Sequence, residues 1–474
     1  MRPYNIHQDQ VWFTMAIFSS LSRQQKEAVG LLQIGTFLEY FDLMLYVHMA
    51  VLLNELFFPK ADPHTASLLA ALAFCSTWVL RPFGALLFGW VGDNIGRKST
   101  VILTTSMMAV SCVIMANLPT YAQIGISAAW IVTICRIVQG LSSMGEIVGA
   151  QIYITEITKP PSQYQAVSLI RFASSIGTFC AIGIAAIVTR YECNWRIAFW
   201  IGAGIAVVGS VARTRLRETP DFVHFKKIKQ REIEEKERRK DVKALELSKI
   251  ELSCKKIKIP KADICAYFSI YCGWPLIFYL VFIYFNPILK SYGYSSEDVI
   301  FHNFWLALIG IIYDGILIAI CSKIHPLTIL KIRTWALFIL VLLFPFIVTT
   351  LATPVHVFIL QSTILVLNLC SLPADSIFIK HFPVLKRFTM TSLVYASSRA
   401  IMHIISAFGL VYLTEAFGHY GVCIIALPVT LGFLWGVNHF EKLENKNSNQ
   451  KPHQFHTPLS THPNEIKLNE TKLA

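Results

Sequence analysis

The chain has 474 residues, of which 54% are hydrophobic and 15% are charged, with a formal net charge of +13. Soluble proteins carry about 25% charged residues, and apolar runs of about 20 residues recur here from end to end. The composition therefore excludes a soluble globular protein and predicts a polytopic helical membrane protein. The basic residues lie in the connections between the runs, as the positive-inside rule distributes charge, and do not indicate nucleic-acid binding.

Twelve apolar runs predict twelve transmembrane helices in an all-α membrane protein. A highly charged stretch separates the first six from the last six, and we expect it to be a solvated helix or a flexible linker. Two six-helix bundles related by pseudo-symmetry around a central site are typical of secondary transporters. The predicted spans are 29–56, 67–90, 100–117, 124–149, 165–189, 196–212, 264–288, 298–321, 328–349, 355–378, 389–413 and 418–437.

The placement of Lys and Arg predicts the orientation of the chain. The basic connections alternate with connections that hold few charges, so the basic ones, and both termini, are expected in the cytoplasm. We expect a monomer that spans the cell (inner) membrane many times. The predicted segments are a cytoplasmic N-terminal segment (1–28), an N-terminal bundle (29–212), a charged cytoplasmic linker (213–263), a C-terminal bundle (264–437) and a polar, disordered cytoplasmic tail (438–474).

The first span carries two acids, Glu39 and Asp42, within an otherwise apolar run. In a helix that starts near Ala28, Glu39 lies about 16 Å along the axis, close to the middle of a hydrocarbon core about 30 Å thick. Together with Tyr46, the two acids share one helix face. An ionised carboxylate at that depth needs a partner, a proton or a water-filled cavity, so this face is predicted to line a polar site.

Span four carries Arg136 and Gln139 in the sequence RIVQG. Counted from the other side, Arg136 lies about 15 Å deep, so we expect it to pair with Glu39. Two acids on one face disfavour double ionisation, which predicts that Glu39 and Asp42 hold an exchangeable proton. The alternative is a purely structural ion pair that clamps spans one and four. Glu146 lies nearer the inner surface and is expected to be a gate or a second pair.

The second half carries Arg399 about 16 Å into span eleven and Asp314 in span eight. Arg399 either faces the cavity and binds a substrate carboxylate opposite Arg136, or pairs with Asp314; both remain open. His302, His356 and His403 are expected to be packed side chains. Trp274-Pro275 and Pro373 are expected to kink their helices. A cluster of aromatic residues is a weak candidate for holding a quaternary ammonium: Tyr271, Trp274, Tyr279 and Tyr284.

The connection after span two reads GWVGDNIGRKS, from Gly89 to Ser99. Its glycines permit a tight turn, and its acid and bases lie at adjoining helix ends, where they can latch one side of the protein shut. A nucleotide-binding loop would need adjacent Gly and Lys after a strand, and here Arg97 intervenes. The predicted gating residues are Gly89, Asp93, Gly96, Arg97, Lys98 and Glu146.

This connection resembles the loop pattern of the major facilitator superfamily, G-x-x-x-D-R-x-G-R-K, and departs from it at Asn94. The first half is similar, more narrowly, to the metabolite:proton symporters, and in particular to the proline/betaine carriers. That resemblance implies proton-coupled transport with Glu39, Asp42 and Arg136 central to coupling and substrate contact. The matching stretches are FLEYFDLMLY (37–46), LFFPKADP (56–63), RPFGALLFGWVGD (81–93), RIVQGLSSMGEIVGA (136–150), NWRIAFW (194–200) and RETPDF (217–222).

The second half departs from the family pattern. Where the loop motif should repeat after span eight, the chain reads CSKIHPL, with Ser322 in place of the acid and His325-Pro326 in place of Gly-Arg. In the second half, only FPVLKRFT (382–389) is similar to the family pattern. We therefore predict a proton-coupled symporter of a small zwitterionic or carboxylate metabolite. The alternative is a degenerate member that works as an uncoupled facilitator or a sensor. The sequence has no metal-ligand spacing, nucleophile elbow or nucleotide motif, so neither a cofactor nor an enzyme is expected.

Overall fold

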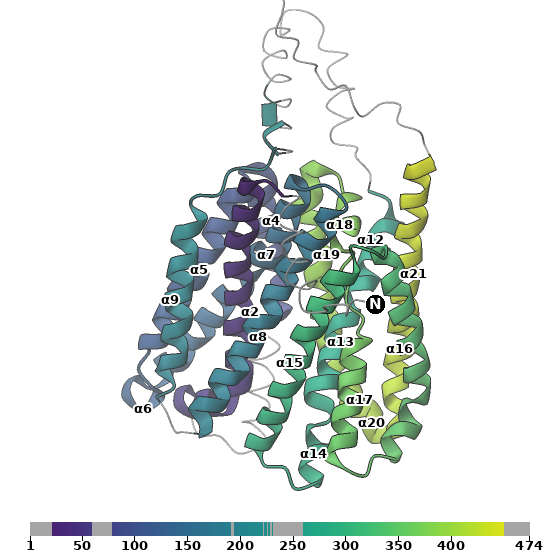
Figure 1. Ribbon diagram of the computed structural model, residues 1–474. Helices are drawn as coiled ribbons and strands as arrows, with labels where there is room; N and C mark the ends of the chain where they lie inside the picture. The colour runs from purple at the N-terminus through teal and green to yellow at the C-terminus, as the bar shows by residue number, and fades with distance from the viewer. Residues whose placement is uncertain are drawn as a thin grey trace, which may run out of the picture.

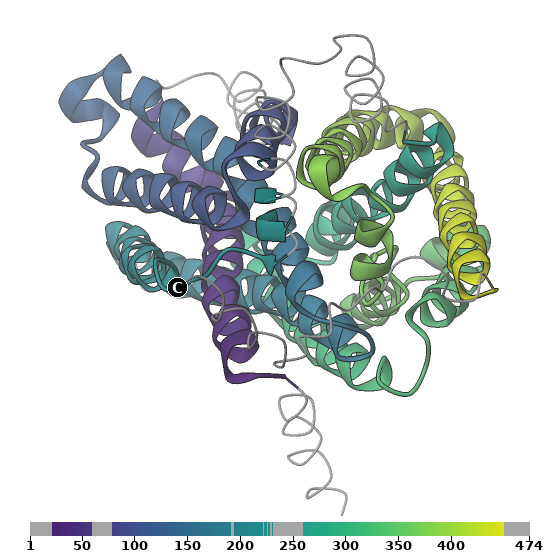
Figure 2. The same ribbon diagram turned by 90° about the horizontal axis from the view of Figure 1, so that it is seen from above.

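The computed structural model describes residues 21–58, 78–190, 194–220, 222–224, 226–227, 230 and 259–449, and its regular structure there is entirely helical. Two groups of helices lie side by side, purple to teal and green to yellow in Figures 1 and 2. The first group is the N-terminal bundle. Its helices are α2 (Arg23–Phe57), α4 (Arg81–Asn94), α5 (Arg97–Asn117), α6 (Tyr121–Ile124), α7 (Ile126–Ile157), α8 (Ser162–Arg190) and α9 (Arg196–Arg213).

The second group is the C-terminal bundle, whose spans are more often interrupted. Its elements are α12 (Lys261–Tyr271), α13 (Gly273–Tyr279), the π-helix η1 (Leu280–Tyr284), α14 (Asn286–Ser291), α15 (Ser296–Ile320), α16 (Pro326–Thr349), α17 (Pro354–Val366), α18 (Asp375–Lys380), α19 (Val384–Ile404), the π-helix η2 (Ile405–Gly409), α20 (Leu410–Phe417) and α21 (Tyr420–Asn449).

The predicted spans agree with these helices. Within the described residues, nine stretches are long and apolar enough to cross a membrane, and two shorter apolar helices accompany them, Arg196–Val211 and Pro354–Val366. All twelve predicted ranges contain helix, although the second is described only from Trp78 onward. Large apolar side chains such as Phe83, Trp130 and Val211 are exposed, as expected where a helix meets lipid rather than water.

Span ten is broken between α17 and α18, around the predicted kink at Pro373. Non-helical backbone at membrane depth is tolerated only where protein groups satisfy its carbonyls. Arg333 of α16 does so: its guanidinium donates to the carbonyl oxygens of Asn368 at 2.6 Å, Cys370 at 3.1 Å and Leu372 at 3.1 Å. Arg333 therefore holds the broken helix in place.

Span seven is also irregular, as Trp274-Pro275 predicts. The helix is divided between α12 and α13, and the π-helix η1 follows. A π-helix leaves local carbonyls without regular partners. One of them, on Val281, accepts a hydrogen bond from the side chain of Gln361 in α17 at 2.6 Å.

The predicted disorder of the polar tail is wrong for residues 438–449. Helix α21 continues to Asn449, because its polar end is held by the C-terminal bundle. His439 contacts Asp263 of α12 at 2.8 Å, and Glu444 contacts His381 at 2.9 Å. Most of the predicted linker and the remainder of the tail lie outside the described residues.

Candidate transport site and gate

Asp42 and Arg136 form an ion pair between α2 and α7, with 3.0 Å between Oδ2 and Nη1. Both side chains are 4% exposed, so solvent screens this pair little. Gln139, one turn after Arg136, donates to Asp42 at 3.0 Å and accepts from Arg136 at 2.9 Å. The ring of Tyr46 lies 4.1 Å from the guanidinium carbon of Arg136. Four of the six residues predicted for coupling and substrate contact therefore form one cluster.

The predicted pairing of Glu39 with Arg136 is corrected by the structure. Glu39 lies 3.4 Å from the guanidinium of Arg81 at the start of α4, while Arg136 pairs with Asp42. Residues three apart on a helix point about 60° away from one another, so the two acids of α2 face different neighbours. The sequence analysis missed Arg81, although this residue lies close to the middle of the predicted second span, 67–90.

Arg399, the sixth predicted residue, is 1% exposed and lies over the ring of Tyr395, 4.5 Å from its centre. Among the described residues, its Nε and Nη1 atoms have no hydrogen-bond partner. The alternative pairing with Asp314 is not observed, because Asp314 accepts a hydrogen bond from Ser175 of α8 at 2.6 Å. His403 stacks on Trp78, with 4.1 Å between the ring centres, as expected for a packed histidine.

A cavity of about 60 Å³ lies between the two bundles, large enough for about four waters. The N-terminal bundle lines it with residues of α2 and α8, and the C-terminal bundle with residues of α13, η1, α15 and the broken span ten. Two charged residues face it, Arg171 and Asp314, and neither Arg136 nor Arg399 is among its lining residues.

Arg171 was missed by the sequence analysis and Asp314 was considered only as a partner of Arg399. Both would have been found by asking which charged residues of spans five and eight lie at equal depth. Only part of the predicted aromatic cluster lines the cavity. Trp274 lines the cavity, whereas the hydroxyl of Tyr271 donates to the buried Asp375 at 2.6 Å. Tyr284 hydrogen-bonds His419 at 2.7 Å.

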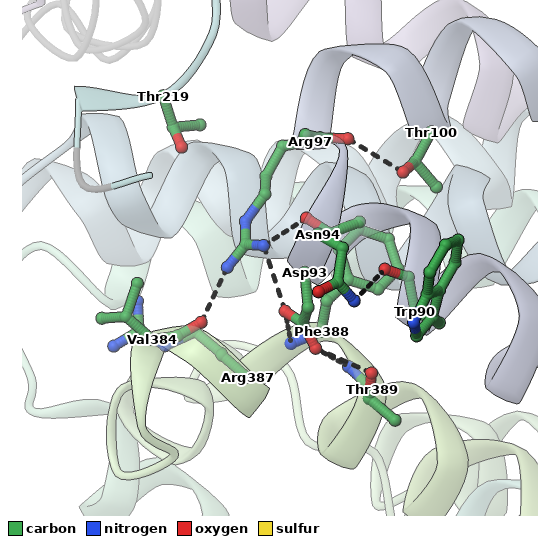
Figure 3. A network of polar contacts seen from close by, with 12 residues as sticks. Trp90, Asp93, Asn94, Arg97, Thr100, Thr219, Val384, Arg387, Phe388 and Thr389 are labelled. Carbon is green, nitrogen blue, oxygen red and sulfur yellow. Dashed lines mark hydrogen bonds and ion pairs between the residues drawn. The ribbon is translucent and has the colours of Figure 1, made fainter. Parts of the chain in front are cut away.

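The loop between α4 and α5 joins the two bundles at one end of the molecule (Figure 3). Asp93 accepts hydrogen bonds from the backbone N–H groups of Phe388 at 3.2 Å and Thr389 at 2.9 Å, near the start of α19. Arg97 pairs with Asp93 at 3.0 Å and donates to the carbonyl oxygen of Val384 at 2.9 Å. We call these contacts, together with those of Glu156 described next, the gate.

Glu156, near the C-terminal end of α7, is the acid at the centre of the gate. Its side chain is fully buried and pairs with Arg97 at 3.3 Å and with Arg387 of α19 at 3.1 Å. The hydroxyl of Thr219 donates to it at 2.8 Å. The sequence analysis named Glu146 instead, whose side chain lies outside the described residues. Glu156 was missed because α7 extends eight residues beyond the predicted end of span four.

The glycines of the loop motif have two different roles. Gly89 lies within α4 rather than in the turn, and a Cβ there would approach the Thr389 Cα to 2.7 Å, so glycine permits close packing of α4 on α19. Gly96 is in the turn, with a φ of +149°, where a Cβ would collide with Glu218. The backbone N–H of Lys98 points to this same carboxylate, at 3.3 Å.

Comparison with known proteins agrees with this architecture. The chain is 32% identical over 213 residues to a proline/betaine transporter of Salmonella typhimurium, which covers 43% of each chain. It is 33% identical over 220 residues to the inner membrane metabolite transport protein YhjE of Escherichia coli, covering 45% of this chain and 50% of that one. The matches thus span half or less of the length of these curated relatives.

The fold is shared with solved transporters. The structure of the proton:xylose symporter XylE bound to 6-bromo-6-deoxy-D-glucose superposes with a TM-score of 0.68 at 15% identity, over 88% of this chain and 95% of that chain. At that identity the likeness concerns the fold alone. The sequence model of the Major Facilitator Superfamily matches residues 32–407, most of the chain. Two helical bundles, a cavity between them and a gate built on the loop between α4 and α5 are thus features of a multi-pass membrane transporter that belongs to the major facilitator superfamily.

Proposed function

We propose that this transporter is a proton-coupled symporter that moves a small zwitterionic or carboxylate metabolite into a bacterial cell by alternating access. The observation that carries the proposal is the cavity between the bundles, into which Arg171 and Asp314 bring opposite charges. A relative that shares 32% identity is named a proline/betaine transporter, which supports the same class of substrate.

In this mechanism the gate is closed while the cavity is reached from the opposite side. The basic residues at the gate support its assignment to the cytoplasmic side, with both termini there and the chain in the inner membrane. The boundaries at residues 28, 212, 263 and 437 and a monomeric state belong to the same proposal. Opening the gate would separate Asp93 and Glu156 from α19, and the two bundles would then rock about the cavity.

Proton coupling is assigned to Glu39 and Asp42, together with Arg81 and Arg136. Each acid is buried against one guanidinium, and each pair joins two helices of the N-terminal bundle. A proton on either acid would weaken its ion pair, and would shift the balance between inward- and outward-facing states only if the acid is solvated differently in the two. Tyr46 and Gln139 would position Arg136.

Transport into proteoliposomes tests the proposal. We expect Glu39→Gln and Asp42→Asn to abolish uphill accumulation driven by a pH gradient while retaining part of the exchange of radiolabelled substrate. Accumulation by both variants at the wild-type level across the same gradient would refute the assignment of the proton site.

The second candidate function is an uncoupled facilitator or a sensor. It is favoured by the second-half loop, where Ser322, His325 and Pro326 stand in place of the acid and Gly-Arg of the family pattern. Uptake by the wild-type protein that equilibrates but never exceeds the external concentration, with or without a pH gradient, would support this candidate instead.

A further inference from the structure

Arg171 and Asp314 face the same cavity but do not form an ion pair in the described part of the chain. Arg171 comes from α8 and is 6% exposed, while Asp314 comes from α15 in the other bundle. Two opposite charges that face one cavity from different bundles, without direct contact, leave space for a ligand that pairs with both.

The partners of these two groups in the closed cavity are weak or neutral. The Nη2 of Arg171 donates to the Sγ of Cys370 at 3.3 Å, and a thiol sulfur is a poor acceptor. Oδ2 of Asp314 accepts from the neutral hydroxyl of Ser175. A carboxylate would form a stronger, charge-assisted interaction with Arg171, and a cation would do the same with Asp314.

The remaining lining is suited to the apolar body of such a ligand. Trp274, Phe278 and Phe282 line the cavity from the C-terminal bundle, and Tyr40 and Met44 line it from α2. The guanidinium carbon of Arg171 lies 5.2 Å from the ring centre of Trp274. Aromatic faces attract alkylated ammonium groups.

We infer that this cavity selects zwitterions over dicarboxylates and over simple cations, with the carboxylate of the substrate on Arg171 and its cationic group on Asp314 beside the aromatic side chains. The inference rests on the proposed function and narrows its substrate class. A dicarboxylate would bring its second negative charge to Asp314, and a cation without a carboxylate would leave Arg171 without a charged partner. Both situations are unfavourable in a buried site.

Binding to the purified full-length chain tests the inference without requiring transport. The ligands are glycine betaine and L-proline as zwitterions, choline as a cation that carries the same trimethylammonium group, and succinate as a dicarboxylate. Isothermal titration calorimetry in detergent is expected to give a Kd for at least one zwitterion that is at least tenfold lower than those for choline and succinate.

Two neutralising variants distinguish a binding role from a structural one. Asp314→Asn is expected to raise the Kd for the zwitterion at least tenfold and to reduce the ratio of the succinate Kd to the zwitterion Kd. Arg171→Gln is expected to raise the Kd for the zwitterion by a similar factor and to reduce the ratio of the choline Kd to the zwitterion Kd. The matched controls are Glu297→Gln, exposed on the first turn of α15, and Arg215→Gln, exposed after α9; both are expected to bind like the wild type.

Three results would overturn the inference: binding of succinate as tight as that of the zwitterions, absence of zwitterion binding to folded wild-type protein, or an equal loss for every ligand in both variants. These outcomes are separate from those for the proposed function. Dicarboxylate uptake driven by a pH gradient would retain proton symport and reject zwitterion selection. Zwitterion binding without uphill uptake would support zwitterion selection and reject proton symport.

Discussion

Glu156 of the N-terminal bundle and Arg387 of the C-terminal bundle form a buried ion pair, with 3.1 Å between Oε1 and Nη1. The same carboxylate pairs with Arg97, which also pairs with Asp93, so Glu156 bridges guanidinium groups from the two bundles. Removing one partner of a buried charge pair costs about 2–5 kcal/mol, much of it from the charges left unpaired. Closure of the gate therefore depends strongly on Glu156.

Glu156→Gln is expected to open the gate. Spin labels at Lys98→Cys and Lys386→Cys, on the two sides of the gate, report this as a shift of the distance distribution toward longer values. The control is Glu444→Gln, which removes an acid that pairs within the C-terminal bundle, with His381. An unchanged distribution in Glu156→Gln would mean that Asp93 alone keeps the gate closed.

Gly89→Ala is expected to prevent full closure of the gate. The added Cβ would meet the backbone of Thr389 in α19, and backbone cannot move aside as a flexible side chain can. We expect a lower transport rate and a longer distance between the same two spin labels. Gly30→Ala is the matched control, because a Cβ at Gly30 would meet nothing within 4 Å. If both variants transport at the wild-type rate, α4 and α19 do not need this close approach.

A double-mutant cycle on Asp42 and Arg136 separates the coupling role from a structural clamp. Asp42→Asn or Arg136→Gln alone is expected to lower the free energy of unfolding by about 3–5 kcal/mol, because each leaves an unpaired buried charge. The double variant should recover much of this loss, as measured by the midpoint of thermal unfolding in detergent. We expect no recovery of uphill uptake; its return in the double variant would identify the pair as a clamp only.

Arg399→Met is expected to keep or raise the unfolding temperature. The guanidinium is buried, and two of its nitrogen atoms lack hydrogen-bond partners in the part of the chain that the structure describes. Burying a charge is costly unless it is paired. Arg136→Met, by contrast, should be destabilising because Asp42 would remain. If Arg399 has a role in transport, uptake by Arg399→Met will fall while the unfolding temperature does not. A large drop in stability would show that the stack on Tyr395 supports the fold.

The sequence predicted the helical architecture well because long apolar runs are a strong signal in a membrane protein. It also indicated the cluster of Asp42, Arg136 and Gln139, since polar residues at membrane depth need partners. It could not identify which acid of α2 meets which arginine, because that depends on rotation of the helix toward α4 or α7. Arg171 was missed for a similar reason: its importance comes from facing a cavity whose other charged residue lies in a different bundle.

Length predictions failed where polar residues continue a helix. Both α7 and α21 extend beyond their apolar runs, and their ends are stabilised by ion pairs with distant parts of the chain. The acid at the centre of the gate lies in one of these extensions. Hydropathy identifies the part of a helix that lies in lipid, and contacts such as those of Glu156 require the tertiary structure.

Several arginines at the ends of the helices are buried in the folded protein. Arg97 and Arg213 are fully buried, and Arg333 and Arg387 are 6% and 7% exposed. The charge bias that orients membrane helices is read while the chain is being inserted, when these side chains still face water. With the predicted orientation, the same guanidinium groups would act first as sorting signals during biosynthesis and later as internal braces. Loss of one of them would reduce the yield of correctly inserted protein as well as its activity.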